Sequence, residues 1–95
     1  MKLVRDKIPE LYPQHSYRKA TPTERLMLLR LKLAEEVGEV LSAPDGQSVL
    51  EELADLSEVA DALREAYGWF EGHLAEEKTR KRAERGGFVV GWVLE

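Results

Sequence analysis

Apolar side chains recur at helical spacing in two segments in the middle of the chain. Residues three and four positions apart share one face of a helix, so both segments are predicted to form amphipathic helices. The first stripe consists of Leu26, Leu29, Leu33, Val37 and Val40. The second consists of Val49, Leu53, Leu56, Ala60 and Leu63.

Start and stop signals bound these two helices. Residues 21–24 read Thr-Pro-Thr-Glu, which is typical of a capping box with Pro at the first helical position. Residues 43–46 contain Pro and Gly and should end this helix near Ser42. Ser48 with Glu51 predicts a second capping box, and a helix from there should end near residue 67, before Gly68.

The rest of the chain carries weaker signals. Residues 72–85 favour a third helix, which should stop before two glycines. The β-branched and aromatic tail at 88–94 favours a short strand that pairs with residues 2–4. Residues 11–20 lack periodicity and are expected to be loop. We therefore expect one all-α domain over residues 1–95, an antiparallel helical hairpin plus a third helix, with short terminal strands.

Pairs of acidic residues three positions apart lie on both helices of the hairpin. Glu36 and Glu39 fall roughly 80° and 140° to one side of the first stripe, and Glu52 and Asp55 have similar offsets of the same hand on the second. When antiparallel helices pack stripe to stripe, edges of the same hand fall on the same side of the pair. The two pairs also lie level about the turn, so we expect the four carboxylates to converge.

Four converging carboxylates would repel one another unless a cation lay between them. Oxygen ligands suit a hard divalent ion, so Glu36, Glu39, Glu52 and Asp55 are predicted to bind Mg²⁺, with Mn²⁺ as an acceptable substitute. Such a site points to chemistry on phosphates. Lys32, one turn before Glu36, either pairs with it or contacts a phosphate.

Charge and composition narrow the class of protein. The net charge of −4 argues against general nucleic-acid binding, and there is no cysteine for a disulfide or thiolate site. No apolar run reaches the length of a membrane span and no signal-peptide core is present, so we expect a cytoplasmic protein without membrane contact. The acidic middle of the chain is flanked by basic ends, which suits an anionic ligand at the edge of a metal site.

A second apolar face on the first helix predicts self-association. Met27, Leu28 and Leu31 lie opposite the main stripe, and three helices cannot cover both faces. We therefore expect a homodimer or homotetramer in which the hairpins assemble into a helical bundle.

The acidic motifs together resemble the all-α nucleoside triphosphate pyrophosphohydrolase superfamily, which includes MazG-like proteins. Its pattern of Glu-Glu-x-x-Glu followed by Glu-x-x-Asp matches residues 35–39 and 52–55. Residues 2–10 (Lys-Leu-Val-Arg-Asp-Lys-Ile-Pro-Glu) and 81–88 (Lys-Arg-Ala-Glu-Arg-Gly-Gly-Phe) resemble a small MazG-like branch. Residues 11–20 and 67–74 lie outside the resemblance.

The resemblance implies Mg²⁺-dependent hydrolysis of a nucleoside triphosphate between its α- and β-phosphates, which would clean the nucleotide pool. Glu36, Glu39, Glu52 and Asp55 would be the metal ligands, and Glu35 would orient or deprotonate the attacking water. Basic side chains would bind the substrate phosphates. The candidates are Lys32, Lys78, Lys81, Arg82, Arg85, Arg5 and Lys7.

Two alternatives stay open. Phosphoribosyl-ATP pyrophosphohydrolase of histidine biosynthesis shares the acidic motif, although that family tends to follow the Asp with an aromatic-His pair and here Leu56-Ser57 follows. The other alternative is a non-catalytic helical dimer that serves as an interaction or regulatory module, with its carboxylates on the surface.

Overall fold

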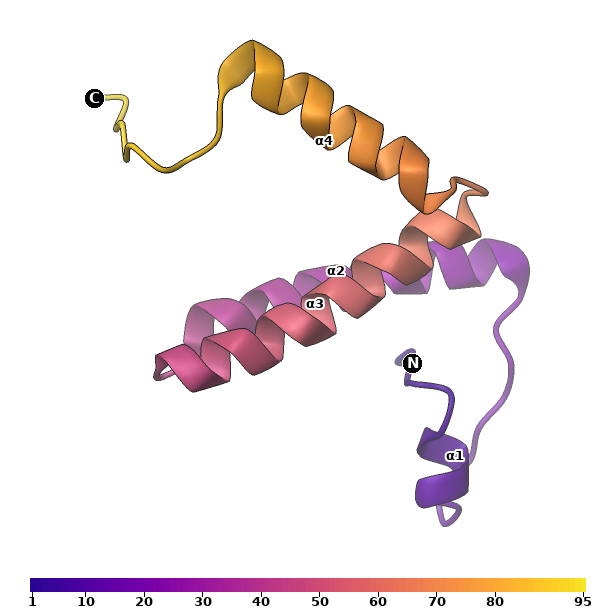
Figure 1. The fold of residues 1–95 in the computed structure, drawn as a ribbon. Coiled ribbons are helices and arrows are strands. Elements are labelled where there is room, and N and C mark those ends of the chain that lie inside the picture. Colours follow the sequence, from indigo (N-terminus) through magenta and orange to yellow (C-terminus); the bar gives the residue numbers. More distant parts are fainter.

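The computed structural model describes residues 1–95 and contains helices only. They are α1 (Ile8–Leu11), α2 (Pro22–Ser42), α3 (Gly46–Ala66) and α4 (Glu71–Arg85) (Figure 1). The all-α prediction is confirmed. The short helix α1 was not predicted, and residues 88–95 form no strand, so the predicted terminal strands are wrong. Strand-favouring residues need a paired strand, and residues 2–5 contact α2 and α3 instead.

The capping residues explain where α2 and α3 begin. The predicted capping box of α2 is present, because the Thr21 side chain accepts from the Glu24 N–H and Glu24 accepts from the Thr21 N–H. The start predicted for α3 is wrong. Asp45 caps this helix by accepting from the Ser48 N–H at 2.8 Å, so α3 begins at Gly46 rather than near Ser48.

Glycines mark the ends of α3 and α4, as predicted. The last helical residue of α3 is Ala66, and Gly68 follows with φ 81°. The predicted third helix is α4, which ends before Gly86 at the same positive φ. Both glycines adopt the left-handed conformation that other residues rarely adopt.

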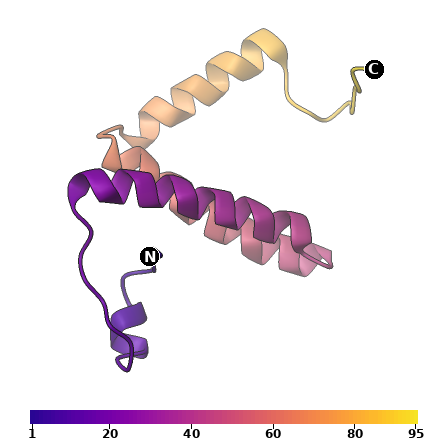
Figure 2. The same cartoon turned by 180° about the vertical axis from the view of Figure 1, so that it is seen from behind.

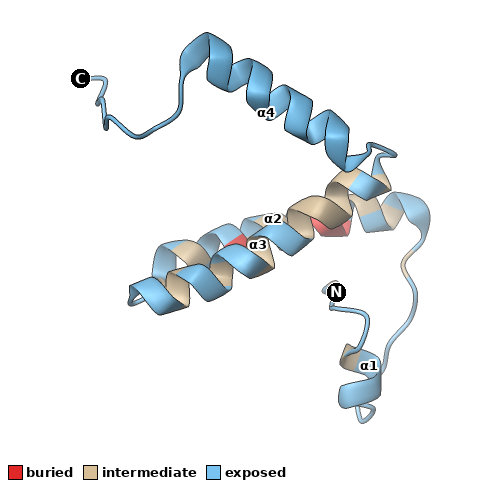
Figure 3. Ribbon diagram, in the orientation of Figure 1, coloured by how far each residue is buried: buried red, intermediate tan, exposed pale blue.

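Helices α2 and α3 lie side by side, and the chain turns back between them through Ala43, Pro44 and Asp45 (Figures 1 and 2). The core between them is small (Figure 3). Leu29 of the predicted stripe is only 3% exposed, whereas Val37 and Leu53 of the two stripes are exposed. Glu36 is 8% exposed and is the single buried charged residue.

The C-terminal third of the chain makes little contact with this pair. Helix α4 projects away from it, and every residue from Tyr67 to the C-terminus is exposed (Figures 1 and 3). The exposed residues include large apolar ones. They are Trp69, Phe70, Leu74, Phe88, Val89, Val90, Trp92, Val93 and Leu94.

The single chain is therefore extended. Its radius of gyration is 16.5 Å, against about 12 Å for a compact domain of this length. Its accessible surface is 8405 Å², whereas a compact monomer of this size exposes about 5,500 Å². None of the helices has the combination of length and hydrophobicity needed to cross a bilayer.

Candidate metal and phosphate site

Three of the four predicted carboxylate ligands converge between α2 and α3. Glu36, Glu52 and Asp55 each offer one oxygen, and the three oxygens lie within 4.8 Å of one another. We call these residues the acidic cluster. The fourth predicted ligand, Glu39, is exposed and lies outside it. Of the two pairs expected to lie level about the turn, Glu36 and Asp55 both belong to the cluster, whereas Glu39, the expected partner of Glu52, does not.

The negative charge of the cluster is only partly neutralised by nearby cationic side chains. Lys32 Nζ lies 3.6 Å from Glu36 Oε1, which is an i,i+4 ion pair. Glu52 has no cationic partner. Partial burial raises the pKa of Glu52 above its ordinary value, and the negative charges of Asp55, Glu39 and Glu36 raise it further. Glu39 therefore acts on the cluster electrostatically although it is not one of the three converging residues.

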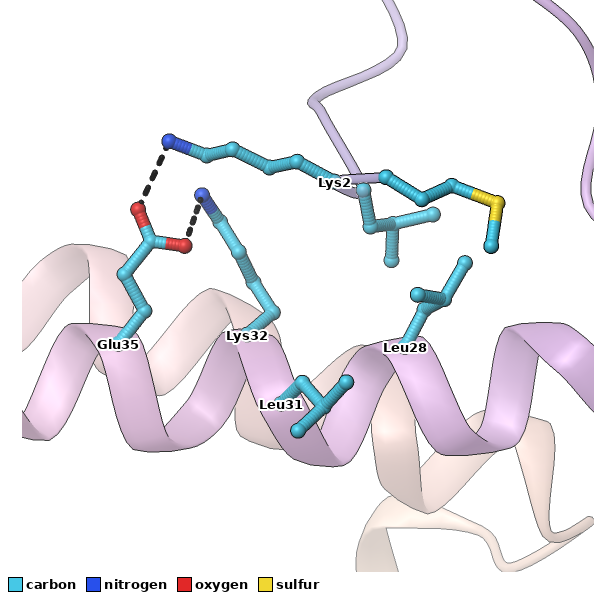
Figure 4. Close-up of a pocket in the computed structure, with 7 residues that line it drawn as sticks. Lys2, Leu28, Leu31, Lys32 and Glu35 are labelled. Atoms are coloured by element: carbon cyan, nitrogen blue, oxygen red, sulfur yellow. Dashed lines mark hydrogen bonds and ion pairs between the residues drawn. The ribbon is translucent and has the colours of Figure 1, made fainter.

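Glu35, the predicted catalytic residue, points to the N-terminal segment instead of the cluster. Lys2 Nζ lies 2.9 Å from one of its carboxylate oxygens and Lys32 Nζ lies 3.4 Å from the other (Figure 4). The hydrogen bond from Lys2 lowers the pKa of Glu35, an effect that desolvation opposes and the charge of Lys32 supports. The structure thus engages this carboxylate in two ion pairs beside a small cavity of about 70 Å³.

A larger groove of about 930 Å³ opens next to the cluster. The N-terminal residues Lys2 to Ile8 form one wall, and α2 and α3 form the other. Glu36 and Asp55 of the cluster lie in its lining. Five cationic side chains share that lining: Lys2, Arg5, Lys7, Arg25 and Lys32. Grooves of this volume hold small organic ligands in many proteins.

The predicted substrate-binding cations divide into two groups. Lys32, Arg5 and Lys7 line the groove, and Arg5 Nη2 lies 2.6 Å from Asp55 Oδ1. The α4 cations Lys78, Lys81, Arg82 and Arg85 are exposed, and none lines the groove or the small cavity. Within one chain, the structure does not bring the α4 cations to the acidic cluster.

Two groove cations, Lys2 and Arg25, were not among the predicted site residues. The signal available for Lys2 was the excess of basic residues at the N-terminus beside an acidic middle. Nothing in the local pattern distinguishes Arg25 from an ordinary exposed helical arginine, because its place in the groove depends on how the N-terminal segment folds back.

No protein-family model matches this chain, and comparisons with the curated proteins and with the solved structures find no match either.

The donor set of the cluster fits a hard divalent cation. Mg²⁺ binds oxygen ligands at about 2.1 Å, so ligands on opposite sides of the ion lie about 4 Å apart. Adjacent ligands of such an ion lie about 3 Å apart, so the three carboxylate oxygens, which lie within 4.8 Å of one another, would have to move inward to bind it together. Carboxylate oxygens suit Mg²⁺ and Mn²⁺, whereas softer metals select thiolate ligands.

Proposed function

We propose that this protein is a Mg²⁺-dependent nucleoside triphosphate pyrophosphohydrolase. One observation supports this most strongly: an acidic cluster with unbalanced negative charge opens onto a groove whose lining holds five cationic side chains among six acidic ones. A metal-bound triphosphate needs both features, carboxylates for the metal and cations for the phosphate oxygens. The motif resemblance of residues 35–39 and 52–55 supports the same reaction.

Glu36, Glu52 and Asp55 would hold the cation, and Glu39 would join them by turning its exposed side chain inward. A bound Mg²⁺ would neutralise part of the phosphate charge and would lower the pKa of water at the site. Mn²⁺, which accepts the same oxygen ligands, would substitute.

The reaction proposed is attack of a water oxygen on the α-phosphorus. The bond between that phosphorus and the oxygen bridging to the β-phosphate breaks, so that a nucleoside monophosphate and pyrophosphate leave. Glu35 would accept the proton of the water. Glu35 faces the N-terminal segment, and its ion pairs with Lys2 and Lys32 lower its pKa, so this role requires its side chain to leave Lys2 and turn toward the cluster.

Cations at the groove would stabilise the charge that grows on the leaving pyrophosphate. Lys32 and Lys7 line the groove within the same chain. The α4 cations Lys78, Lys81, Arg82 and Arg85 would reach a phosphate only from a second chain, since they lie away from their own cluster.

Self-association belongs to this proposal. The surface of one chain exceeds that of a compact monomer by about 2,900 Å², or about 5,800 Å² for two chains, which is at the upper end of the total area that obligate homodimers bury. We propose that two or four copies cover the apolar tail and the outer face of α2, where Leu31 is 60% exposed, and so form a helical bundle.

The test is release of pyrophosphate from a panel of canonical and modified nucleoside triphosphates with Mg²⁺, with phosphoribosyl-ATP included. The wild type should release pyrophosphate and form the monophosphate, and Glu52→Gln should not. Glu51→Gln is the matched control, because Glu51 is the preceding acid on α3, contacts Gln47 and lies outside the cluster.

Activity confined to phosphoribosyl-ATP would favour the histidine-biosynthesis alternative. If the wild type releases pyrophosphate from none of these compounds, the proposal is wrong and the interaction-module alternative gains weight.

A further inference from the structure

Two ion pairs tie the N-terminal segment to the helices that carry the acids. Lys2 pairs with Glu35 of α2, and Arg5 pairs with Asp55 of α3. All other ion pairs of the chain join residues close in sequence. The segment thus contacts both acidic helices, and one of its contacts is made to a member of the acidic cluster.

We propose that Arg5 is a phosphate-binding residue that exchanges its partner: it pairs with Asp55 while the acidic cluster holds no metal, and it binds a phosphate oxygen of the substrate once the metal and the triphosphate are bound. This inference rests on the proposed function and goes beyond it, because it assigns two positions to one side chain and predicts opposite effects on two ligands.

The geometry makes the Arg5 pair and metal binding compete. Arg5 Nη2 lies 2.6 Å from Asp55 Oδ1, and a metal ion would bind the same carboxylate at about 2.1 Å. The guanidinium and the ion would then share one carboxylate a few ångströms from each other, and a second anion between them would further relieve their repulsion. A triphosphate is such an anion, and Arg5 already lines the groove that would receive it.

Arg5 is free to make this exchange. Its side chain is 59% exposed, and residues 1–5 form neither helix nor strand, so the segment can shift without breaking a ladder of backbone hydrogen bonds. A guanidinium can bind phosphate through two parallel N–H donors, and Arg5 uses only Nη2 in its contact with Asp55. An ion pair this exposed contributes little to folding, so breaking it costs little.

The experiment titrates the full-length chain with two probes, Mg²⁺ alone and inorganic tripolyphosphate in the presence of Mg²⁺, by isothermal calorimetry. Arg5→Gln should bind Mg²⁺ alone about two- to fivefold more tightly than the wild type, because a competitor is gone. It should bind tripolyphosphate about tenfold more weakly, because a charged hydrogen-bond donor is gone.

Arg18→Gln is the matched control. It removes the same charge from the same end of the chain, but Arg18 pairs with Glu24 and does not line the groove. It should leave both affinities unchanged. A variant that merely folds poorly would lose affinity for both probes, so the opposite signs distinguish exchange from damage.

If Arg5→Gln binds Mg²⁺ no more tightly than the wild type, or binds tripolyphosphate equally well, the exchange is wrong while the metal site stands. If the wild type binds neither probe, the exchange and the proposed function both fail.

Discussion

The pair formed by α2 and α3 contrasts with the α4 region, residues 67–95. In the pair, a small apolar core and two helix caps hold three carboxylates within 4.8 Å of one another. In the α4 region every residue is exposed, and the one hydrogen-bonding and ring contact from its side chains to α2 or α3 is that of Tyr67 with Arg30. One chain thus brings three carboxylates together by itself, whereas the role that we propose for the α4 region requires a second chain.

The largest expected effect is the loss of activity on substitution of Glu36, a residue of the acidic cluster. Glu36→Gln should reduce pyrophosphate release about 100-fold or more, because it removes a charged ligand from the cluster. Glu39→Gln should cost less, since Glu39 lies outside the group of three. Rates measured at saturating nucleotide and Mg²⁺ decide this, with Glu51→Gln as the control outside the cluster and the groove. Equal losses for Glu36→Gln and Glu39→Gln would contradict the division seen between these two residues.

The next effect compares two leucines of α2. Leu29→Ala should lower the free energy of unfolding by about 2–5 kcal/mol, because Leu29 is fully packed between the helices. Leu31 is exposed in one chain, so Leu31→Ala would be nearly neutral in a monomer. If a second copy covers this face, Leu31→Ala should instead cost a comparable amount.

Urea denaturation at two protein concentrations measures both leucine variants. A neutral Leu31→Ala variant whose stability does not depend on concentration would show that this face stays open.

A smaller effect is expected from the tail. Trp92→Ser should shift the assembly toward smaller species, because a large aromatic residue that is exposed in one chain would be an anchor in an interface. Sedimentation velocity at several concentrations measures the shift, with Glu95→Gln as a control at the same end. A wild type that sediments as a monomer at all concentrations would contradict the proposal that a second chain covers the α4 region.

The smallest effect is a pH dependence of stability. The pKa of Glu52 is raised in the folded chain above its ordinary value of 4.5. The folded state therefore binds the proton more tightly than the unfolded state, and stability falls as pH rises from the ordinary pKa through the raised one. Glu52→Gln removes this loss, so the variant should melt at a higher temperature than the wild type at pH 7 and at nearly the same temperature at pH 4. Melting curves without Mg²⁺ measure this, and a difference that does not change with pH would contradict it.

The sequence was informative where local physics decides the outcome. The Thr21 cap, the ends of α3 and α4 and the convergence of Glu36, Glu52 and Asp55 follow from capping chemistry and helical spacing. The start of α3 was missed because Asp45 and Ser48 are both good caps, and only the observed hydrogen bond distinguishes them.

The N-terminal contacts and the tail could not be predicted in this way. Arg5 and Asp55 are separated by fifty positions, and no local pattern specifies their contact. The tail at 88–94 has the composition of a strand, but a strand forms only where a second strand is available to pair with it. Both cases depend on long-range contacts.

The most direct test of the central claim is thermal melting with and without Mg²⁺ at low ionic strength, for the wild type and Glu52→Gln. If the acidic cluster binds the ion, Mg²⁺ should raise the melting temperature of the wild type by mass action and leave Glu52→Gln nearly unchanged. The control Glu51→Gln should respond like the wild type. A wild type that melts at the same temperature with and without Mg²⁺ would contradict the metal site and the phosphate chemistry built on it.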